Sequence, residues 1–320
     1  MSMVSTVTVT VPATTANLGP GFDCIGAALT LYNQFKFINL EAMPSADGRQ
    51  TERLRIKVSG AEAQLVNTST DNLVYQAFVK LYEHLEQTPP PVEIEIELGI
   101  PLARGLGSSA TAIVGGLVGA NQLAGKPLDV TEVMKLAIAI EGHPDNVVPA
   151  LLGGCRLAVK GFNDELSKLG DWEVCELRWH EDLVPVLGIP NFELSTKEAR
   201  GVLPAEYTRA DAIFNISHFG LLLRGLETGR GDWLKIALQD KIHQPYRQQL
   251  IPGYDAVLCA AVDAGAYGMV ISGAGPTLLA LAASSQGAAV EAAMTSAWKQ
   301  EGIVAQVLAL SIDTQGTILI

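Results

Sequence analysis

The segment Pro101-Leu-Ala-Arg-Gly-Leu-Gly-Ser-Ser-Ala-Thr111 joins a predicted strand to a predicted helix. In the strand, residues 92–98, apolar side chains alternate with glutamates, which is typical of a sheet with one buried face. The helix covers about residues 109–124 and ends at a Gly-Lys-Pro sequence. These flanking elements make the segment a strand-to-helix loop.

The composition of this loop is typical of a phosphate-binding site. Gly105 and Gly107 permit positive φ and let a ligand approach the backbone closely. Ser108 and Ser109 stand at the start of the helix, where unpaired N–H groups and the helix dipole attract an anion. The alternative is an ordinary glycine turn with a serine N-cap, and the Gly-x-Gly pattern alone does not separate the two.

The segment fits the patterns of two other known nucleotide-binding loops poorly. No lysine follows the last glycine, as a Walker loop requires. Gly105, Gly107 and Ala110 match a loose dinucleotide-binding pattern, but the first glycine does not follow the strand directly. The acidic residue expected downstream would be Asp129 or Glu132, and both belong to a predicted helix start. We therefore disfavour a dinucleotide site.

The overall composition is that of a globular chain with too much negative charge for nucleic acid. Of its 320 residues, 48% are hydrophobic and 18% are charged, and the net charge is -12 at pH 7. Phosphate backbones need a basic footprint, so we expect no nucleic-acid partner. Residues 105–125 and 264–283 carry no charge, but Gly, Ser, Thr or Pro interrupt both. We read them as core and loops, and we expect no membrane span.

The cysteines and the first residues of the chain indicate where in the cell the protein is located. The four cysteines show neither Cys-x-x-Cys pairing nor metal spacing, and we interpret them as reduced thiols. The first residues lack the basic start of a signal peptide and lead into a strand pattern. We therefore expect a cytoplasmic protein.

Mixed strands and helices predict an α+β protein with two domains. The polar, glycine-containing stretch 161–171 sets the boundary, which gives domains over residues 1–165 and 166–320. We expect helices to start at Asp71 and at two capping boxes, Asp129 with Glu132 and Ser195 with Glu198. In the second half we expect strands and two long helices, the strands at 172–179, 184–189, 267–272, 277–282 and 304–310 and the helices at 208–227 and 286–300.

Two further loops carry residues suited to chemistry. Glu141-Gly-His-Pro-Asp-Asn146 offers a hard oxygen for Mg²⁺ and polar groups for a substrate, or it is only a helix-to-helix turn capped by Asp145. Ser272-Gly-Ala-Gly-Pro-Thr277 leaves a buried strand through two glycines, which indicates a close backbone approach or a tight turn. No spacing supports a Ser-His-Asp assembly or a zinc site.

Three separated motifs resemble those of the GHMP kinases, a family of small-molecule kinases. They are the segments Pro12–Asp23 (Pro-Ala-Thr-Thr-Ala-Asn-Leu-Gly-Pro-Gly-Phe-Asp), Pro101–Ala110 and Ser272–Thr277, and they occur in the family's order. Within the family, the chain is most similar to the branch that phosphorylates L-homoserine. That branch is marked by Ala16–Asp23, by His143-Pro-Asp-Asn146 followed by Val-Val-Pro, and by Ser195-Thr-Lys-Glu-Ala-Arg200.

The resemblance implies a fold and a nucleotide site. The N-terminal domain should be like domain 2 of ribosomal protein S5, and the C-terminal domain should be ferredoxin-like. ATP would lie between them with its phosphates on residues 105–109, and Mg²⁺ would be held by Ser109 (or Ser108) and Glu141. The implied nucleotide-binding set is Pro101, Leu102, Ala103, Arg104, Gly105, Leu106, Gly107, Ser108, Ser109, Ala110 and Thr111.

The resemblance also implies that L-homoserine is the substrate. It would be held by Asn17, Asp23, His143, Asn146, Thr196, Arg200 and Arg247, and the catalytic set would be Asn146, Glu141 and Ser109. Arginine suits the substrate carboxylate, Asp23 its ammonium and Asn146 its hydroxyl.

Some related kinases use an aspartate base, for which this chain offers no secure counterpart. We therefore expect catalysis by positioning and charge stabilisation.

Other interpretations stay open at this point. The chain could be a GHMP kinase for another small alcohol, such as mevalonate or galactose. It could also be a non-catalytic sensor that has kept the fold, although the intact Ser108, Ser109 and Glu141 argue against this. An RNA-binding role like that of S5 is disfavoured by the net charge of -12. The oligomeric state is open, with a homodimer as one expectation.

Overall fold

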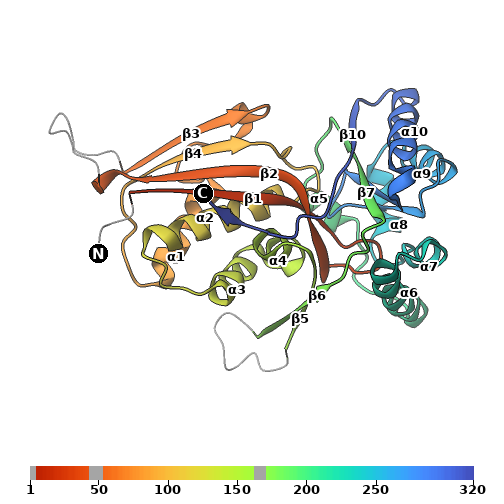
Figure 1. The fold of residues 1–320 in the computed structure, drawn as a ribbon, viewed down its shortest axis with the longest axis horizontal. Coiled ribbons are helices and arrows are strands. Elements are labelled where there is room, and N and C mark those ends of the chain that lie inside the picture. The colour runs from red at the N-terminus through yellow and green to blue at the C-terminus, as the bar shows by residue number, and fades with distance from the viewer. Residues whose placement is uncertain (1–4, 43–52, 162–170) are drawn as a thin grey trace.

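A computed structural model describes residues 5–42, 53–161 and 171–320. In this part of the chain, seven strands form one sheet and four form another, and the two sheets lie toward opposite ends of an elongated molecule (Figure 1). The fold is α+β with two domains, as predicted. Four short 3₁₀ helices also occur, at Leu40–Ala42, Ala63–Leu65, Gln248–Leu250 and Ser284–Gln286.

The larger sheet belongs to the N-terminal domain and has helices on one face. Its central strands run in the order β11-β1-β2-β4-β3, while β5 pairs with β2 and β6 pairs with β5. All pairs are antiparallel except β3 with β4. The elements are β1 (Thr6–Ala16), β2 (Ile25–Asn39), β3 (Leu54–Gly60), α1 (Leu73–His84), β4 (Val92–Leu98), α2 (Ser108–Leu123), α3 (Val130–Glu141), α4 (Pro144–Leu152), β5 (Cys155–Lys160), β6 (Trp172–Leu177) and β11 (Ile318–Leu319).

Helix α2 packs unusually close to this sheet, which explains the uncharged stretch at 105–125. A Cβ atom on Gly115 would lie 2.4 Å from the ring of Phe35, and one on Gly119 would lie 2.2 Å from the ring of Phe37. Both rings are buried on β2. The predicted helix is confirmed as a core helix, and no helix of the described residues is long and apolar enough to cross a membrane.

The smaller sheet has the order β10-β7-β9-β8, with helical connections after its first and third strands. In chain order this is a β-α-β-β-α-β unit with strand order 4-1-3-2, which is the ferredoxin-like arrangement that was predicted. The elements are β7 (Leu183–Pro190), α5 (Thr196–Gly201), α6 (Arg209–Thr228), α7 (Gly231–Ala237), α8 (Gln244–Arg247), α9 (Tyr254–Asp263), β8 (Gly268–Ile271), β9 (Leu278–Ala283), α10 (Gly287–Gln300) and β10 (Ala305–Ala309).

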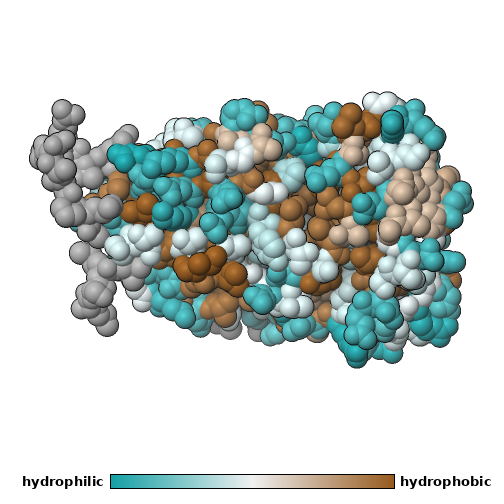
Figure 2. All heavy atoms as spheres, turned by 45° about the horizontal axis from the view of Figure 1, so that its top comes forward, coloured by the Kyte–Doolittle hydropathy of each residue, from teal (hydrophilic) through white to brown (hydrophobic). Residues whose placement is uncertain are grey.

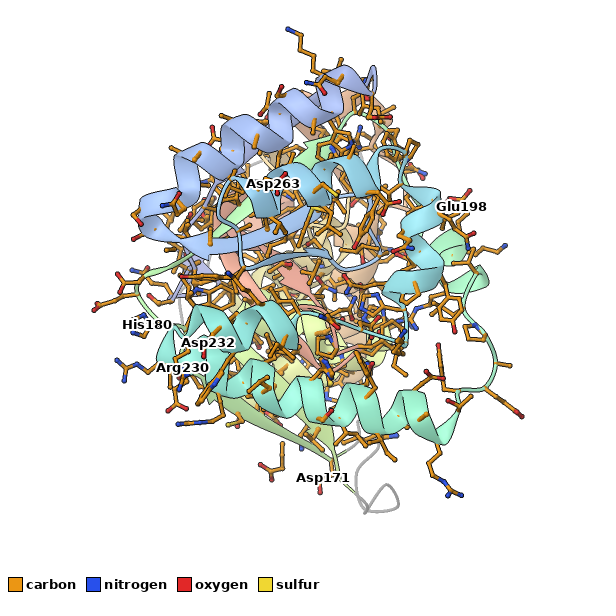
Figure 3. The ribbon with its side chains drawn as sticks, turned by 90° about the vertical axis from the view of Figure 1, so that its right-hand side faces the viewer. Asp171, His180, Glu198, Arg230, Asp232 and Asp263 are labelled. Carbon is orange, nitrogen blue, oxygen red and sulfur yellow. The ribbon has the colours of Figure 1, made fainter. Side chains whose placement is uncertain are left out.

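Alternation along β9 builds two separate cores on the two faces of this sheet. Leu278 and Ala280 pack with α9 and α10 in one cluster. Leu279 and Leu281 belong to another cluster that includes residues of α6 and α7 and, from the N-terminal domain, Leu18. Figure 3 shows α9 and α10 on one side of the sheet and α6 and α7 on the other. Asp263 marks the end of α9, and Arg230 and Asp232 mark the start of α7. The second cluster joins the two domains through an apolar core.

The molecular surface mixes polar and apolar residues over both domains. Figure 2 turns the top of Figure 1 toward the viewer and shows hydrophobic patches separated by hydrophilic residues. This agrees with the composition of a globular chain.

Three details differ from the sequence predictions. The predicted boundary between residues 165 and 166 lies outside the described residues, but β5 and β6 on either side of it pair with each other. The predicted strand 172–179 therefore belongs to the N-terminal sheet, as does β11 near the C-terminus. The chain therefore leaves the N-terminal sheet only after Leu177. The reason is that β5 and β6 pair with each other although the polar stretch 161–171 separates them in the sequence. The cap of α1 is Asn72, whose side chain accepts from two backbone N–H groups, and not Asp71.

Candidate active site

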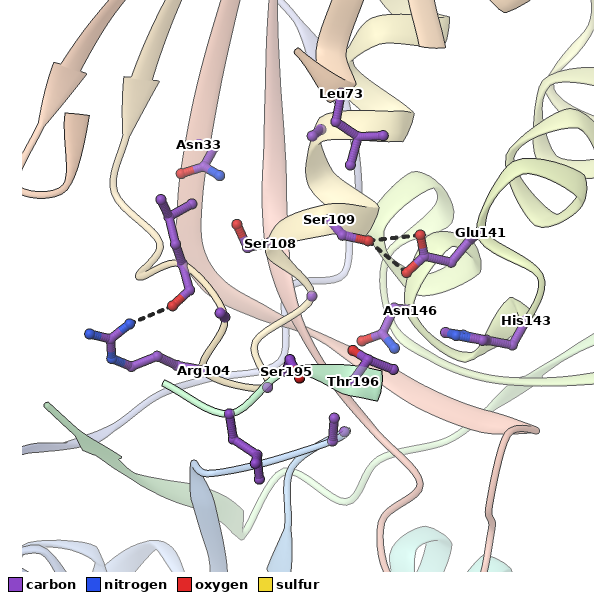
Figure 4. A pocket seen from close by; sticks show the side chains of 18 of the residues that line it. Asn33, Leu73, Arg104, Ser108, Ser109, Glu141, His143, Asn146, Ser195 and Thr196 are labelled. Carbon is purple, nitrogen blue, oxygen red and sulfur yellow. Dashed lines mark hydrogen bonds between the residues drawn. The ribbon is translucent and has the colours of Figure 1, made fainter. Parts of the chain in front are cut away.

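A cavity of about 490 Å³ lies between the two domains and gathers most of the predicted site residues. All seven predicted substrate residues line it, and so do Glu141 and seven residues of the predicted nucleotide loop. The other members of that loop set do not line it, and Leu106, Ala110 and Thr111 among them are buried. Figure 4 shows the cavity from close by.

Helix α2 begins at the cavity without a side-chain cap. Its N-cap is Gly107 at φ 68°, and Ser108 is the first helical residue. The alternative of a serine N-cap is therefore wrong. Because glycine offers no side-chain acceptor, the N–H groups of the first turn remain available to an anion.

The carbonyl groups of the same loop are held by the C-terminal domain. Leu194 N–H donates to the carbonyl of Ala103 at 3.2 Å, and the Ser272 hydroxyl donates to that of Gly105 at 2.7 Å. A Cβ atom on Gly105 would lie 2.3 Å from the carbonyl oxygen of Ser272. The close backbone approach predicted for the segment starting at Ser272 is confirmed, and its partner is the glycine loop.

The side chain of Arg104 is engaged in holding this loop. Its guanidinium lies 3.0 Å from the carboxylate of Glu62 and donates to the carbonyls of Pro190 at 3.0 Å and Asn191 at 3.4 Å. It also donates to the carbonyl of Leu102. We therefore limit the proposed phosphate contact of Arg104 to its main chain.

One part of the cavity wall, which we call the metal end, holds the predicted metal ligands. The Ser109 hydroxyl lies 2.7 and 2.8 Å from the two carboxylate oxygens of Glu141, which comes from the end of α3 (Figure 4). Ser108 also lines the cavity. No group of three or more His, Cys, Asp and Glu side chains in the described ranges could hold a metal. One carboxylate and one hydroxyl suit Mg²⁺, which binds few protein ligands when substrate phosphates complete its shell.

Another part of the cavity wall, which we call the substrate end, holds an ion pair between the two domains. Arg200 on α5 donates to both carboxylate oxygens of Asp23, at 2.7 and 3.0 Å. Asp23 sits at φ 58°, a left-handed conformation that aspartate tolerates better than most residues, and its N–H donates to the side chain of Asn17. Two residues predicted to bind opposite charges of one substrate therefore bind each other here.

Arg247 lies beside this pair but is deeper in the protein. Only 2% of its surface is exposed, and it donates to the carbonyls of Ala199 and Gly273, each at 3.0 Å. Burial, together with the nearby charge of Arg200, lowers the pKa of Arg247 from its ordinary value. Both guanidinium groups lie near the ring of Phe22. The ring centroid is 5.1 Å from the guanidinium carbon of Arg247 and 5.5 Å from that of Arg200.

A short network fixes the polar side chains at the start of α4. The His143 Nδ1 atom lies 2.9 Å from Asp145 Oδ1, and the Asn146 amide nitrogen donates to the same oxygen at 3.3 Å. The hydrogen bond to Asp145 raises the pKa of His143, although burial opposes this. His143 is the N-cap of α4, so the prediction of Asp145 as cap is wrong. Thr196, at the start of α5, also lines the cavity.

The rest of the cavity wall was not predicted from the sequence. An apolar part is formed by the side chains of Phe35, Val66, Leu73, Val74, Ile96, Leu98 and Ala112, and polar residues near it include Asn33, Asn67, Asp71 and Asn72. The alternation of apolar residues with glutamates over residues 92–98 predicted that Ile96 and Leu98 are buried, but it did not predict that they line a site. Asn33 gave no sequence signal, yet it accepts from the N–H groups of Gly99 and Ile100 and donates to Thr111.

The geometry of a glycine loop, a helix N-terminus and a cavity between two α+β domains defines a nucleotide-dependent small-molecule enzyme. The family model for the GHMP kinases N terminal domain matches residues 72–154, and that for the GHMP kinases C terminal matches residues 222–300. The chain belongs to the GHMP kinase family.

Its relatives carry a more specific name. The chain is 69% identical to "Homoserine kinase" of Nostoc punctiforme and 68% identical to "Homoserine kinase" of Trichormus variabilis, and each alignment covers 99% of both chains. A crystal structure of homoserine kinase from Cytophaga hutchinsonii has a TM-score of 0.86 and 30% identity, covering 100% of this chain and 99% of that one.

Proposed function

We propose that this enzyme transfers the γ-phosphoryl group of ATP to the hydroxyl of L-homoserine, giving O-phospho-L-homoserine for threonine biosynthesis. The observation that carries the proposal is the ion pair between Asp23 and Arg200 on the wall of the cavity that also holds Glu141. The name shared by the relatives, at 68–69% identity over 99% of their lengths, supports it.

An amino-acid zwitterion complements this ion pair. A substrate carboxylate would take over the two-point contact of Arg200, and a substrate ammonium would take over the carboxylate of Asp23. Each charged group then exchanges one opposite charge for another. Mevalonate brings no ammonium and galactose brings no charge, so either would leave a member of the pair without a new partner. The geometry therefore favours homoserine over these alcohols.

The start of α2 and the apolar part of the cavity wall suit the nucleotide. We propose that the triphosphate lies on the first turn of α2 and that Ser109 and Glu141 hold Mg²⁺, which would neutralise the charge that builds up on the transferred group. The apolar wall that contains Phe35 and Leu73 would receive the base.

Phosphoryl transfer in this proposal needs no carboxylate base. The amide of Asn146 cannot accept a proton from the substrate hydroxyl. The carboxylate of Asp145 is already engaged in hydrogen bonds with the side chains of His143 and Asn146. The rate enhancement would come from alignment of the hydroxyl with the γ-phosphorus and from stabilisation of charge.

A coupled assay of ADP release tests the proposal. The purified enzyme should release ADP with L-homoserine, should need Mg²⁺, and should show little turnover with mevalonate or galactose. Preferred turnover of another alcohol would assign a different substrate. ATP binding without ADP release for any of them would favour the sensor alternative.

Two finer expectations belong to the same proposal. We propose a cytoplasmic location, which is supported by four cysteines that form no disulfide in the structure. We also propose a homodimer, which size-exclusion chromatography with light scattering would test.

A further inference from the structure

Thr14 contacts both halves of the reaction site although it was in neither predicted set. It lies near the end of β1 with 0% of its surface exposed. Its backbone N–H donates to the carbonyl of Leu106 in the glycine loop at 3.1 Å. Its hydroxyl donates to the Oδ1 atom of Asn146 at 2.7 Å. One residue thus connects the loop proposed for the phosphates to the amide proposed for the acceptor.

The network around Asp145 settles which way the Asn146 amide faces. The carboxylate of Asp145 accepts a hydrogen bond, so the atom of Asn146 beside it must be the NH₂ nitrogen. The amide oxygen then faces Thr14 and needs a donor, which the Thr14 hydroxyl supplies. Asn146 is therefore held at both of its polar atoms.

The contact with Thr14 is also tightly packed against the start of α2. A Cβ atom on Gly107 would lie 1.9 Å from the Thr14 hydroxyl oxygen and 3.1 Å from Asn146 Oδ1. The Thr14–Asn146 pair therefore touches the N-cap of the helix that receives the phosphates. A shift of this pair would move the acceptor amide relative to the phosphate loop.

We propose that Thr14 is a positioning residue for phosphoryl transfer, whose hydroxyl fixes the Asn146 amide against the glycine loop. The inference rests on the proposed function, in which Asn146 contacts the acceptor hydroxyl. Alignment is the main source of catalysis in that function, and a displacement of about 1 Å can lower a rate roughly 100-fold. The Thr14 hydroxyl should therefore matter for turnover more than for binding.

The test compares Thr14→Val, which keeps the shape and loses the donor, with Thr14→Ser, which keeps the donor. We expect Thr14→Val to lower kcat about 10- to 100-fold with both KM values within about threefold, and Thr14→Ser to recover most of the loss. Thr10→Val on the same strand is the control and should be nearly silent. If Thr14→Val does not fold, Thr14→Ala takes its place. A drop in both kcat and ATP affinity without rescue by serine would overturn the proposal.

A double-mutant cycle with Asn146→Ala separates this inference from the proposed function. If Thr14 acts through Asn146, then Thr14→Val should cost little further activity in the Asn146→Ala background. Equal losses in both backgrounds would show that Thr14 acts in another way. Full activity of Asn146→Ala would instead refute the acceptor role of Asn146 and the inference with it. An impaired Asn146→Ala beside an active Thr14→Val would refute the inference alone.

Discussion

Two pairs of predicted ligands that bind each other line the cavity, Ser109 with Glu141 at the metal end and Asp23 with Arg200 at the substrate end, and the two pairs are built differently. Ser109 and Glu141 come from α2 and α3, which pack in one domain around one core. Asp23 and Arg200 come from different domains. The metal end is therefore fixed by local packing, whereas the substrate end depends on how the domains meet. Substitutions at the first should affect the chemical step, and substitutions at the second should affect substrate affinity.

The largest effect is expected at the metal end. Glu141→Ala should lower kcat roughly 100- to 1000-fold, because a fixed charge that organises the transferred group is lost. The variant should still fold, since the hydrogen bond to Ser109 joins side chains at the cavity surface. Steady-state kinetics at several Mg²⁺ concentrations check this, with Glu97→Ala, at an exposed position of β4, as the matched control. Near-normal turnover at low Mg²⁺ would remove Glu141 from the ligand set.

The substrate end should respond in affinity. Arg200→Leu should raise the homoserine KM about 10- to 150-fold, because a charge-assisted hydrogen bond contributes roughly 1.5–3 kcal/mol. The ATP KM should change much less. Arg200→Lys should recover only part of the loss, since an ammonium cannot make the flat two-point contact. Arg209→Leu, exposed at the start of α6, is the control. Equal rises in both KM values would contradict the division between the two ends.

A smaller effect is expected where the two ends meet. Gly107→Ala places a Cβ atom 1.9 Å from the Thr14 hydroxyl oxygen, whereas Gly125→Ala meets nothing within 4 Å. Both positions have positive φ, which costs each variant roughly 1–2 kcal/mol of unfolding free energy, and the clash with Thr14 adds a further loss in Gly107→Ala alone. Gly107→Ala alone should weaken ATP binding. If displacement of the loop costs roughly 1–2 kcal/mol of binding free energy, the ATP affinity falls about 5- to 30-fold. Calorimetry that found equal ATP affinity in both variants would show that the loop is only a turn.

The smallest effect concerns His143 and pH. Its pKa is raised from 6.5 by the hydrogen bond to Asp145, so the folded state binds this proton more tightly than the unfolded state does. The resulting stability is fully present below about pH 6.5 and is lost as the pH rises through the raised pKa. The unfolding free energy of the wild type minus that of His143→Gln should therefore shrink as the pH rises above about 6.5. Urea titrations that showed a growing difference would reverse the assignment.

Local sequence signals predicted the elements that carry the site. The capping boxes at Asp129 and Ser195 are both present, and the alternation before the glycine loop marks β4 correctly. These signals are local, because a cap or an alternating strand is determined by residues a few positions apart. The resemblance to a known family added the residues that the cavity brings together.

Contacts between distant segments were not predictable in the same way. The return of β11 to β1 and the pairing of β6 with β5 join segments that no local pattern relates. Thr14 belonged to a motif without a role of its own and Asn33 to a predicted strand, and the roles of both appear only where β1 and β2 meet the glycine loop. Asp145 was interpreted as a cap because its position before a helix is the stronger local signal.

The most direct test of the account is a crystal structure with Mg²⁺, L-homoserine and a non-hydrolysable ATP analogue. We expect phosphates on the first turn of α2, a metal beside Ser109 and Glu141, and the homoserine carboxylate on Arg200 with its ammonium on Asp23. The substrate hydroxyl should lie beside Asn146 and face the γ-phosphorus. Homoserine bound elsewhere while the Asp23–Arg200 pair stays intact, or phosphates bound away from α2, would contradict it.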